Sequence, residues 1–477
     1  MSHLKVAIPL YGKMALRSFH SPHFLEALAR HHLTPLYFLG PHYFQLCEQD
    51  SPRYFELKTK DYDQEHQHCR LARWLPELRR FVVRTDTTDL RFRESIETSL
   101  FQAPVARVLA YAALMDVLRR LPGMGPLAAW WENRADRRQV HRQTLWDQGV
   151  RGVLTPGFGS YGFEYEGFFA REAKSLGLKV VAAITNYDNI VNRGFRGFMP
   201  DKVAVWSRLM ADEAMSLQKI PAFRIEITGP VQFDHLFQPL PVSREEYLQS
   251  LGLDPAQKTI LFAGGVNITR YFEIYRLLLD SPAFGAASRP NLIIRPYPHS
   301  KLLSSPGWQV LEKLFSQNDR VYISNPMSTS ADNLLASDLK RDLAWGQDAD
   351  DLYYLLKVSE VMINIFSTIS LEAAICDLPV IHLGYDLYTF GHSYDMTTAF
   401  QQRQTHNRRK LRLQAARIAK DENDLLRHLG AYLQDRRLDG EARHAYALSE
   451  CGYLDGKSSQ RLAALLESCL GAGQGNN

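Results

Sequence analysis

Short apolar segments alternate with amphipathic ones twice along this chain of 477 residues, and this alternation is what most constrains its fold. In the first half, strand-like runs at 5–11 and 34–40 flank a helical pattern at 21–31. A second series starts with the run 258–265 and ends with the segment 361–384. Strands that alternate with helices favour a parallel α/β sheet. We therefore predict an α/β protein with two Rossmann-like domains, since one core seldom serves so long a chain.

Interruptions of this pattern give the expected domain boundaries. Residues 1–240 should form the first domain, with the Arg- and Trp-rich stretch 64–150 as a helical insertion. Residues 231–245 contain two prolines and little periodicity, which indicates a linker. The second domain is expected over 246–405. The mainly helical segment 406–477 is expected to pack back toward the first domain.

Composition restricts the compartment and the class of partner. The formal net charge is only +4, from 56 basic and 52 acidic residues, which argues against nucleic acid as a partner. Five scattered cysteines argue against a disulfide framework and favour a reducing compartment. No apolar stretch approaches the roughly 18–20 residues that span a bilayer. We expect a cytoplasmic protein, and attachment to the inner face of the plasma membrane stays open.

Glycine and polar residues follow the ends of two predicted strands in the second half. Gly264 and Gly265 end the first strand, where the missing side chains let a ligand approach the backbone. Arg295 and His299 follow the next strand, within a segment that its prolines stiffen. Ligands of open parallel sheets bind outside the carboxyl ends of strands. These residues are therefore candidates for one binding edge.

The segment FSTISLE, residues 366–372, places hydroxyl groups and a carboxylate at a third strand end. Thr368 is expected to cap the following helix and to share one helical face with Glu372. Ser367 and Thr368 would hold a phosphate at the helix start, and Glu372 would bind a sugar diol such as a ribose. Ser370 joins this candidate donor-binding group. The alternative is an ordinary helix cap with an ordinary dipole partner.

The first half has its own candidate loop, NYDNIVNRGFRG, between two predicted strands. Asp188, Asn189 and Arg193 lie in this loop. If the two domains face each other, the loop would overhang the same crevice. The alternative is a simple turn built from Asn, Asp and Gly residues.

Several of these segments resemble bacterial GT-B glycosyltransferases of the surface-polysaccharide type. TNYDNIVNRG, ITGPVQFD, LIIRPYPH, INIFSTISLEAAICDLPVI and LDGKSSQRLAALL occur in the order found in that group. CDP-glycerol glycerophosphotransferases and UDP-N-acetylglucosamine 2-epimerases are similar more distantly. The likeness covers about residues 150–465. It implies a GT-B fold, two domains that face a cleft, and a nucleotide-sugar donor in the second domain.

The resemblance also implies roles for single residues. Ser367 and Thr368 would bind the donor diphosphate and Glu372 its ribose, while Arg295 and His299 would lie near the phosphates. In the group, the first-domain loop usually reads Ser-Trp-Asp-Asn. This chain keeps the Asp and the Asn but has Asn-Tyr before them, which leaves the donor or acceptor preference open. The Gly-Gly pair of the epimerases is also replaced, by Thr-Ile, which weakens the epimerase interpretation.

GT-B enzymes resemble one another in working without a bound metal, so no cofactor and no metal are expected. The pair Asp348 and Asp350 precedes an amphipathic pattern and is interpreted as helix N-terminal charge. If the reaction inverts the anomeric centre, a general base is required. Asp188, His20 and His23 are the candidates. Both histidines lie in the predicted loop GKMALRSFHSPHF, where Arg17 would hold the acceptor.

The expected activity is transfer of a sugar from a nucleotide-sugar donor to a glycan or lipid-linked acceptor. A phosphotransferase that uses a CDP-linked alcohol and a non-catalytic nucleotide-binding scaffold are the alternatives. Arginines beside Trp130 and Trp131 in the insertion suit contact with an anionic membrane surface. The competing interpretation of the insertion is a solvated helical face with ordinary core tryptophans.

Overall fold

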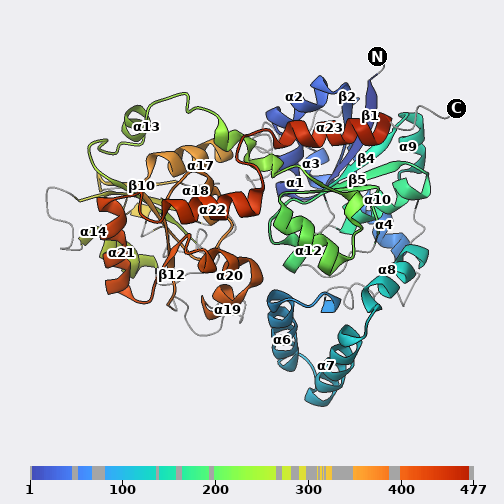
Figure 1. Cartoon of the computed structure of the whole chain (residues 1–477), viewed down its shortest axis with the longest axis horizontal. Coiled ribbons are helices and arrows are strands. Elements are labelled where there is room, and N and C mark those ends of the chain that lie inside the picture. The colour runs from blue at the N-terminus through green and yellow to red at the C-terminus, as the bar shows by residue number, and fades with distance from the viewer. Residues whose placement is uncertain are drawn as a thin grey trace. The chain divides into compact units, whose positions relative to one another are not determined.

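A computed structural model describes most of the chain: residues 3–45, 52–66, 81–135, 139–156, 164–192, 198–264, 271–280, 289–296, 318–324, 347–385 and 398–471, with 309, 312, 313 and 315. The described residues form two compact units (Figure 1). The first unit contains the chain up to Phe237 and the C-terminal segment from Ser449. The second unit contains the described residues from Gln238 to Leu448.

The first unit is built on a seven-stranded parallel sheet with the order β3-β2-β1-β4-β5-β6-β7. Its strands are β1 (Leu4–Leu10), β2 (Leu33–Leu39), β3 (Tyr54–Glu56), β4 (Gly152–Thr155), β5 (Lys179–Ala183), β6 (Lys202–Val205) and β7 (Ile225–Ile227). The chain winds outward from β1 in both directions, so the strand order reverses between β1 and β4. Such a switch point is where open parallel sheets usually bind ligands.

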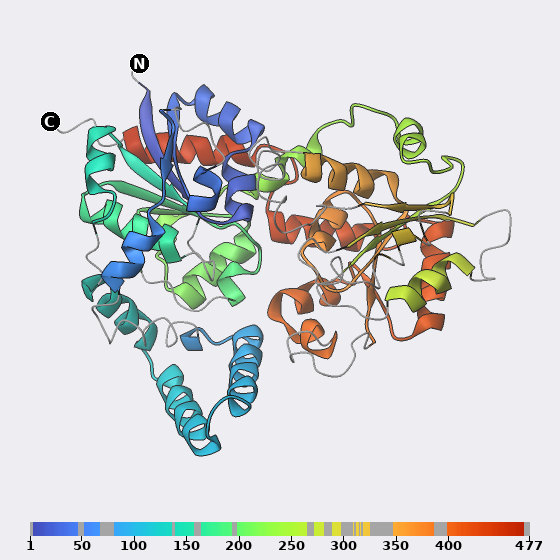
Figure 2. The same ribbon diagram turned by 180° about the vertical axis from the view of Figure 1, so that it is seen from behind.

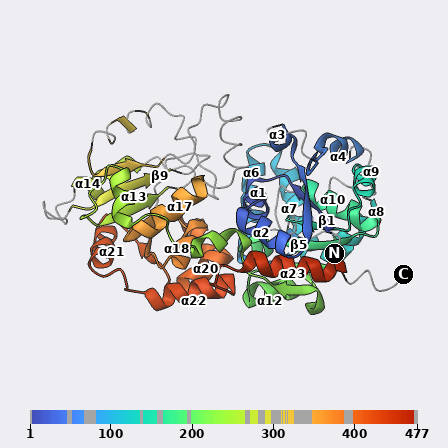
Figure 3. The ribbon, with the colours of Figure 1, turned by 90° about the horizontal axis from the view of Figure 1, so that it is seen from above.

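Helices cover both faces of this sheet. They are α1 (Lys13–Phe19), α2 (Pro22–Arg30), α3 (Pro41–Phe44), α10 (Glu164–Ser175), α11 (Asn189–Asn192), α12 (Arg208–Gln218) and α23 (Ser458–Gly471). On one face, α2 and α23 lie side by side over alternate residues of β1 such as Ile8 (Figure 3). On the other face, the ring of Phe169 from α10 packs 4.7 Å from that of Phe38 in β2. Both faces of the central strands are therefore buried, which explains their continuous apolar runs.

A buried carboxylate joins the C-terminal helix to the first unit. Asp234 lies in a 3-10 helix, η3 (Val231–Phe237), and is 2% exposed. It accepts the backbone N–H groups of Ser458 at 2.9 Å and Ser459 at 2.7 Å. These are N–H groups that the first turn of α23 cannot satisfy internally. Gly456 has a φ of +67°, and a side chain there would meet Phe237, so the approach to α23 requires a glycine.

A helical insertion separates β3 from β4. Its described helices are α4 (Thr59–His66), α6 (Asp86–Leu100), α7 (Val105–Arg120), α8 (Met124–Ala135) and α9 (Arg142–Asp147). Glu172 of α10 anchors its two ends, accepting the hydroxyl of Tyr62 at 2.7 Å and the backbone N–H of His141 at 2.6 Å. Burial lowers the pKa of His141 to about 3, so the ring stays neutral and accepts the N–H of Lys58. Figure 2 shows that α6 and α7 are the part of the insertion that lies farthest from the sheet.

The second unit contains a six-stranded parallel sheet with the order β10-β9-β8-β11-β12-β13. The strands are β8 (Thr259–Ala263), β9 (Asn291–Arg295), β10 (Val321–Ile323), β11 (Val361–Asn364), β12 (Val380–Leu383) and β13 (Arg417–Ala419). Two parallel sheets with helical crossovers confirm the predicted α/β fold class. No described helix is both long enough and apolar enough to cross a membrane.

Helices also cover the second sheet. They are α13 (Arg244–Ser250), α14 (Tyr271–Asp280), α17 (Gln347–Val358), α18 (Ile369–Ile375), α19 (Thr398–Arg403), α20 (Thr405–Arg412), α21 (Glu422–Gln434) and α22 (Gly440–Cys451). α14 and α21 share one core with β8 and β11, in which Tyr275, Phe262 and Leu429 are buried. The chain passes from the second unit to the first at Ser449, inside α22.

Three local expectations were wrong. Residues 231–237 are not a linker, because Val231, Phe233 and Leu236 are buried in the first unit. The predicted loop after β1 instead forms α1, whereas α2 matches the helical pattern predicted at 21–31, with the hydroxyl of Ser21 accepting the N–H of Phe24. The segment after 408 is not purely helical, since β13 adds a strand to the second sheet.

Replacing Asp234 by alanine should destabilise the first unit by about 2 kcal/mol, because two buried N–H groups lose their acceptor. An asparagine side chain would keep one acceptor oxygen, so Asp234→Asn should cost less. Thermal unfolding and amide exchange in α23 measure the effect. Asp212→Ala, at an exposed ion pair of α12, is the matched control. Equal melting temperatures for the Asp234→Ala and Asp212→Ala variants would contradict the anchoring role.

Candidate functional site

The turn from β11 into α18 is organised by Asn364, a fully buried residue that ends the strand. Its Oδ1 accepts the backbone N–H of Ser367 at 3.0 Å, and its Nδ2 donates to Ser367 Oγ at 2.9 Å. Nδ2 also lies 3.3 Å from the carbonyl oxygen of Ala263, the last residue of β8. Asn364 therefore fixes the turn and joins it to the neighbouring strand end.

A strained residue precedes this turn. Phe366 has a φ of +43°, a region that costs a residue with a side chain roughly 1–2 kcal/mol. Its N–H donates to His382 Nδ1 at 3.2 Å, and its ring stacks on the His382 ring at 4.3 Å. Burial lowers the pKa of His382 far below its ordinary value, and the nearby Lys410 adds to this effect. His382 is therefore neutral, as its role of acceptor requires.

The predicted donor-binding residues of α18 differ in exposure. Ser367, Thr368 and Glu372 are half-buried, whereas Ser370 is buried and donates its hydroxyl to the carbonyl of Ser367 at 2.9 Å. The expected capping by Thr368 is wrong: its backbone is already helical, and its side chain makes no cap hydrogen bond. Asn364 holds Ser367 instead, so the chain enters the helical conformation one residue earlier.

Gly264 and Arg295 lie at the same edge of this sheet. The N–H of Gly264 donates to the carbonyl of Arg295 at 2.8 Å, and the Arg295 guanidinium donates to Ser324 Oγ at 2.9 Å. Arg295 is only 7% exposed. Burial and then Asp351 raise the pKa of Tyr247, and Arg295 partly opposes them, so Arg295 lies among groups from α13 and α17. In this structure, the buried Arg295 side chain stabilises this edge of the sheet through its hydrogen bond to Ser324.

The loop after β5 contains the candidate base of the first unit. Asn192 Nδ2 donates to Asp188 Oδ2 at 2.9 Å, and Asn189 Nδ2 donates to Thr185 Oγ1 at 3.2 Å. Asp188 Oδ1 is buried and has no hydrogen-bond partner among the described residues. The loop therefore orients a carboxylate and leaves one oxygen able to accept a proton.

The insertion supports this loop directly. From the start of α6, Thr85 donates its hydroxyl to the carbonyl of Val191 at 2.6 Å. Further along α6, Arg91 Nε donates to Asn192 Oδ1 at 3.1 Å. Asn192 is thus held by Arg91 on one side and holds Asp188 on the other. The position of the candidate base depends on α6.

Glu166 is a buried carboxyl group that the sequence did not single out. It lies in α10 beside the end of β1, where Oε1 accepts the N–H of Tyr11 at 2.8 Å. Full burial raises its pKa to about 8, although hydrogen bonds from Tyr11 and Gly12 act in the opposite direction. Oε2 has no hydrogen-bond partner within the described ranges. A carboxyl group with so high a pKa can hold its proton at neutral pH, and this one lies at the switch point of the sheet.

The remaining first-unit candidates fall into separate groups. His20 Nε2 lies 3.0 Å from the hydroxyl of Tyr54, and its ring packs 4.8 Å from that of Tyr37. Burial lowers the pKa of His235 to about 4, with smaller contributions from Arg17 and His23. Arg17 and His23 thus lie near His235, whereas His20 lies against β2 and β3.

Gly265, His299 and Arg193 lie outside the described residues. Asp348 and Asp350 fall in the first turn of α17, as the interpretation of helix N-terminal charge expected. Over the described ranges, no three His, Cys, Asp or Glu side chains are grouped in a way that suits a metal ion.

Comparison with known proteins shows which family a part of the chain resembles. Residues 326–468 match the family model of CDP-glycerol:poly(glycerophosphate) glycerophosphotransferase, which covers most of the site around α18. No curated protein matches the chain. The match covers less than a third of the chain and, together with the two-sheet fold, agrees with the predicted resemblance to GT-B enzymes related to CDP-glycerol glycerophosphotransferases.

Similar solved structures extend over both units. A UDP-N-acetylglucosamine 2-epimerase superposes with a TM-score of 0.52 at 13% identity, covering 100% of this chain and 99% of that chain. The enzyme of the same name from Methanocaldococcus jannaschii gives 0.51 at 11% identity, covering 98% and 100%. A putative one from Listeria monocytogenes gives 0.50 at 10% identity, covering 100% and 98%. At these identities the likeness establishes the fold alone.

Glu166→Gln should change how stability depends on pH. Because burial raises the pKa of the folded-state carboxyl from 4.5 to about 8, the folded protein holds a proton that the unfolded chain releases in this window. The contribution of Glu166 to wild-type stability should therefore be greatest below about pH 4.5 and fall by up to about 1.4 kcal/mol per pH unit as the pH rises toward 8. The variant lacks this slope.

Urea unfolding at several pH values, followed by tryptophan fluorescence, measures the difference. Glu97→Gln, at an exposed position of α6, is the matched control and should keep the wild-type slope. Parallel curves for the Glu166→Gln variant and the wild-type protein would show that folding does not raise the pKa of Glu166.

Proposed function

We propose that the chain transfers a sugar from a nucleotide-sugar donor to a glycan or lipid-linked acceptor in bacterial surface-polysaccharide synthesis. The observation that carries the proposal is the turn after β11, where half-buried hydroxyl groups and a carboxylate stand at the carboxyl end of a central parallel strand. A lipid-linked acceptor would require work at the inner face of the plasma membrane. Neither a cofactor nor a bound metal is part of the proposal.

The second unit is assigned to the donor. Ser367 and Thr368 would donate hydrogen bonds to the diphosphate, and Glu372 would accept from the ribose hydroxyls. Asn364 and the His382–Phe366 stack hold this turn in shape before a ligand arrives. Donors fixed in advance stabilise a leaving diphosphate well, because no reorganisation is needed during the reaction. Arg295 and His299 remain proposed neighbours of the phosphates.

The first unit is assigned to the acceptor. Asp188 would take the proton of the attacking hydroxyl through its unpartnered Oδ1, while Asn192 holds Oδ2. This arrangement favours Asp188 over His20, whose Nε2 already faces the Tyr54 hydroxyl. Asn189 and Arg193 are proposed on the acceptor side, and Arg17 and His23 stay candidates for contact with the acceptor.

A second candidate is transfer of a phospho-alcohol from a CDP-linked donor. The match of residues 326–468 to a glycerophosphotransferase family favours it. Both reactions would release a nucleotide from the same kind of turn. They differ in the nucleobase of the donor and in the group transferred. The identity of the nucleotide that binds separates them.

A thermal-shift screen of UDP-, GDP-, CDP- and dTDP-linked sugars and of CDP-alcohols tests the donor class. A donor at about a hundred times its Kd stabilises by about 2.7 kcal/mol, which corresponds to roughly 5–10 °C for a domain of this size. Stabilisation by CDP-glycerol alone would favour the phosphotransferase. If no nucleotide shifts the melting temperature, the donor assignment is wrong.

Glu372→Gln and Asp188→Asn should affect different steps. Glu372→Gln should weaken donor binding about 10–100-fold, because charged hydrogen bonds to the ribose are lost. Asp188→Asn should leave donor binding intact and lower turnover about 10²–10⁴-fold. Calorimetric binding and single-turnover transfer measure the two effects, and Asp212→Asn on the surface of α12 is the control. Donor binding without turnover in the wild-type protein would indicate a non-catalytic scaffold.

A further inference from the structure

The insertion exposes far more apolar surface than the rest of the described chain. Among the described residues, seventeen large hydrophobic side chains are exposed, and eleven of them lie between Leu100 and Trp146. Phe101 is 91% exposed, and Trp130 and Trp131 are 56% and 44% exposed. The two tryptophans are therefore not core residues, and this concentration exceeds the scattered apolar residues of an ordinary surface.

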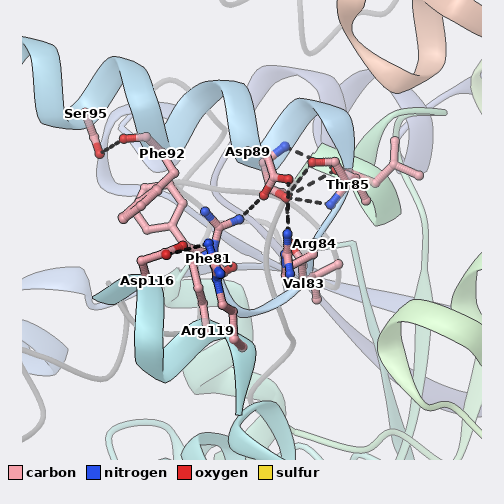
Figure 4. Close-up of polar contacts among 12 residues, drawn as sticks. Phe81, Val83, Arg84, Thr85, Asp89, Phe92, Ser95, Asp116 and Arg119 are labelled. Atoms are coloured by element: carbon pink, nitrogen blue, oxygen red, sulfur yellow. Dashed lines mark hydrogen bonds and ion pairs between the residues drawn. The ribbon is translucent and has the colours of Figure 1, made fainter. Parts of the chain in front are cut away.

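Helix α7 is oriented with a charged residue inward. The side chain of Arg119 is only 4% exposed and pairs with Asp89 of α6 (Figure 4). Its Nε donates to the carbonyl of Phe81 at 3.2 Å, and its guanidinium lies 4.6 Å from the centre of the Phe92 ring. Met115 packs in the same small core. These contacts fix which side of α7 faces the protein.

The opposite side of α7 is apolar. Its large side chains are 46–58% exposed and recur at helical spacing, namely Val105, Leu109, Leu114, Val117 and Leu121. Alanines at 106, 110 and 113 lie among them. We call these five large residues the outer face of α7. A surface helix normally buries its apolar stripe, so α7 has the inverse arrangement, and no described residues cover its outer face.

Charge around the outer face favours an anionic partner. Arg107 and Arg120 are exposed on α7, and Asp116, its only acidic residue, forms an ion pair with Arg120 at 2.6 Å, so Arg107 supplies the net positive charge of this side. Residues 64–150 contain 14 basic and 10 acidic residues, so this segment carries the whole formal charge of +4 and the rest of the chain is neutral. Arginine and tryptophan beside an apolar helix face are typical of elements that lie at a bilayer interface.

We propose that the outer face of α7 inserts into the headgroup region of an anionic lipid bilayer, with α7 parallel to the membrane plane. A segment of 16 residues that contains three arginines and an aspartate is unsuited to crossing the bilayer. A position at the membrane surface suits the lipid-linked acceptor of the proposed function. Only this explanation of why the protein would bind a membrane rests on the proposed function. The binding itself involves neither donor nor acceptor.

Vesicle flotation of the full chain tests the proposal, with phosphatidylcholine vesicles and with vesicles containing phosphatidylglycerol. We expect binding to the anionic vesicles that weakens in high salt. Leu109→Gln with Val117→Gln should lower the partition coefficient about tenfold or more. Arg107→Gln should lower it about fivefold for anionic vesicles and leave neutral vesicles unaffected.

The double variant Phe223→Gln with Val242→Gln is the matched control, since it removes two exposed apolar side chains outside the insertion and should bind like the wild-type protein. All substitutions are at exposed positions, and circular dichroism checks that each variant folds. Wild-type protein that fails to float with anionic vesicles at low salt overturns the proposal. So does a concentration-dependent dimer that Leu109→Gln with Val117→Gln dissociates. Neither result bears on donor binding, which is measured without vesicles.

Discussion

The carboxylate of Asp234 is the contact on which the first unit most depends. It joins two parts of the chain that are 224 residues apart, with the whole second unit between them. Without α23, one face of the seven-stranded sheet would lose the cover that α23 provides together with α2. A single cap therefore makes the chain's last helix part of its first domain. The bond from Asp234 to α23 also explains why η3 is buried in the first unit and is not a linker, although prolines lie nearby.

The backbone of the candidate site in the second unit is held by residues other than those proposed to contact the donor. Asn364, His382 and the left-handed Phe366 determine the path of the backbone, and the half-buried residues of α18 then follow. Residues in strained conformations persist only where their surroundings fix them, and they concentrate at functional sites. The neutral imidazole of His382 meets this need, because a protonated ring could not accept the N–H of Phe366.

Much of the fold could be predicted because apolar runs and helical periodicity are local features. The two parallel sheets and the position of the polar turn at 366–372 follow from them. The role of Glu166 could not be predicted, since its partner Tyr11 is 155 residues away, and neither could the contact of Asn364 with Ala263, 101 residues away. Thr368 is a residue type that often caps helices, yet the hydrogen bonds of Asn364 determine the conformation of the turn before α18. The side of α7 that faces the protein could not be predicted from the sequence either, because the inward position of Arg119 depends on its ion pair with Asp89 of α6.

The contacts of α6 with the Asp188 loop have a consequence for protein engineering. Thr85 and Arg91 supply hydrogen bonds that Val191 and Asn192 would otherwise lack. The insertion is thus not a detachable module, and excising it for crystallisation or swapping it between homologues would disturb the loop it supports. A chimera that replaces the insertion has to exchange α6 and α11 as a matched pair.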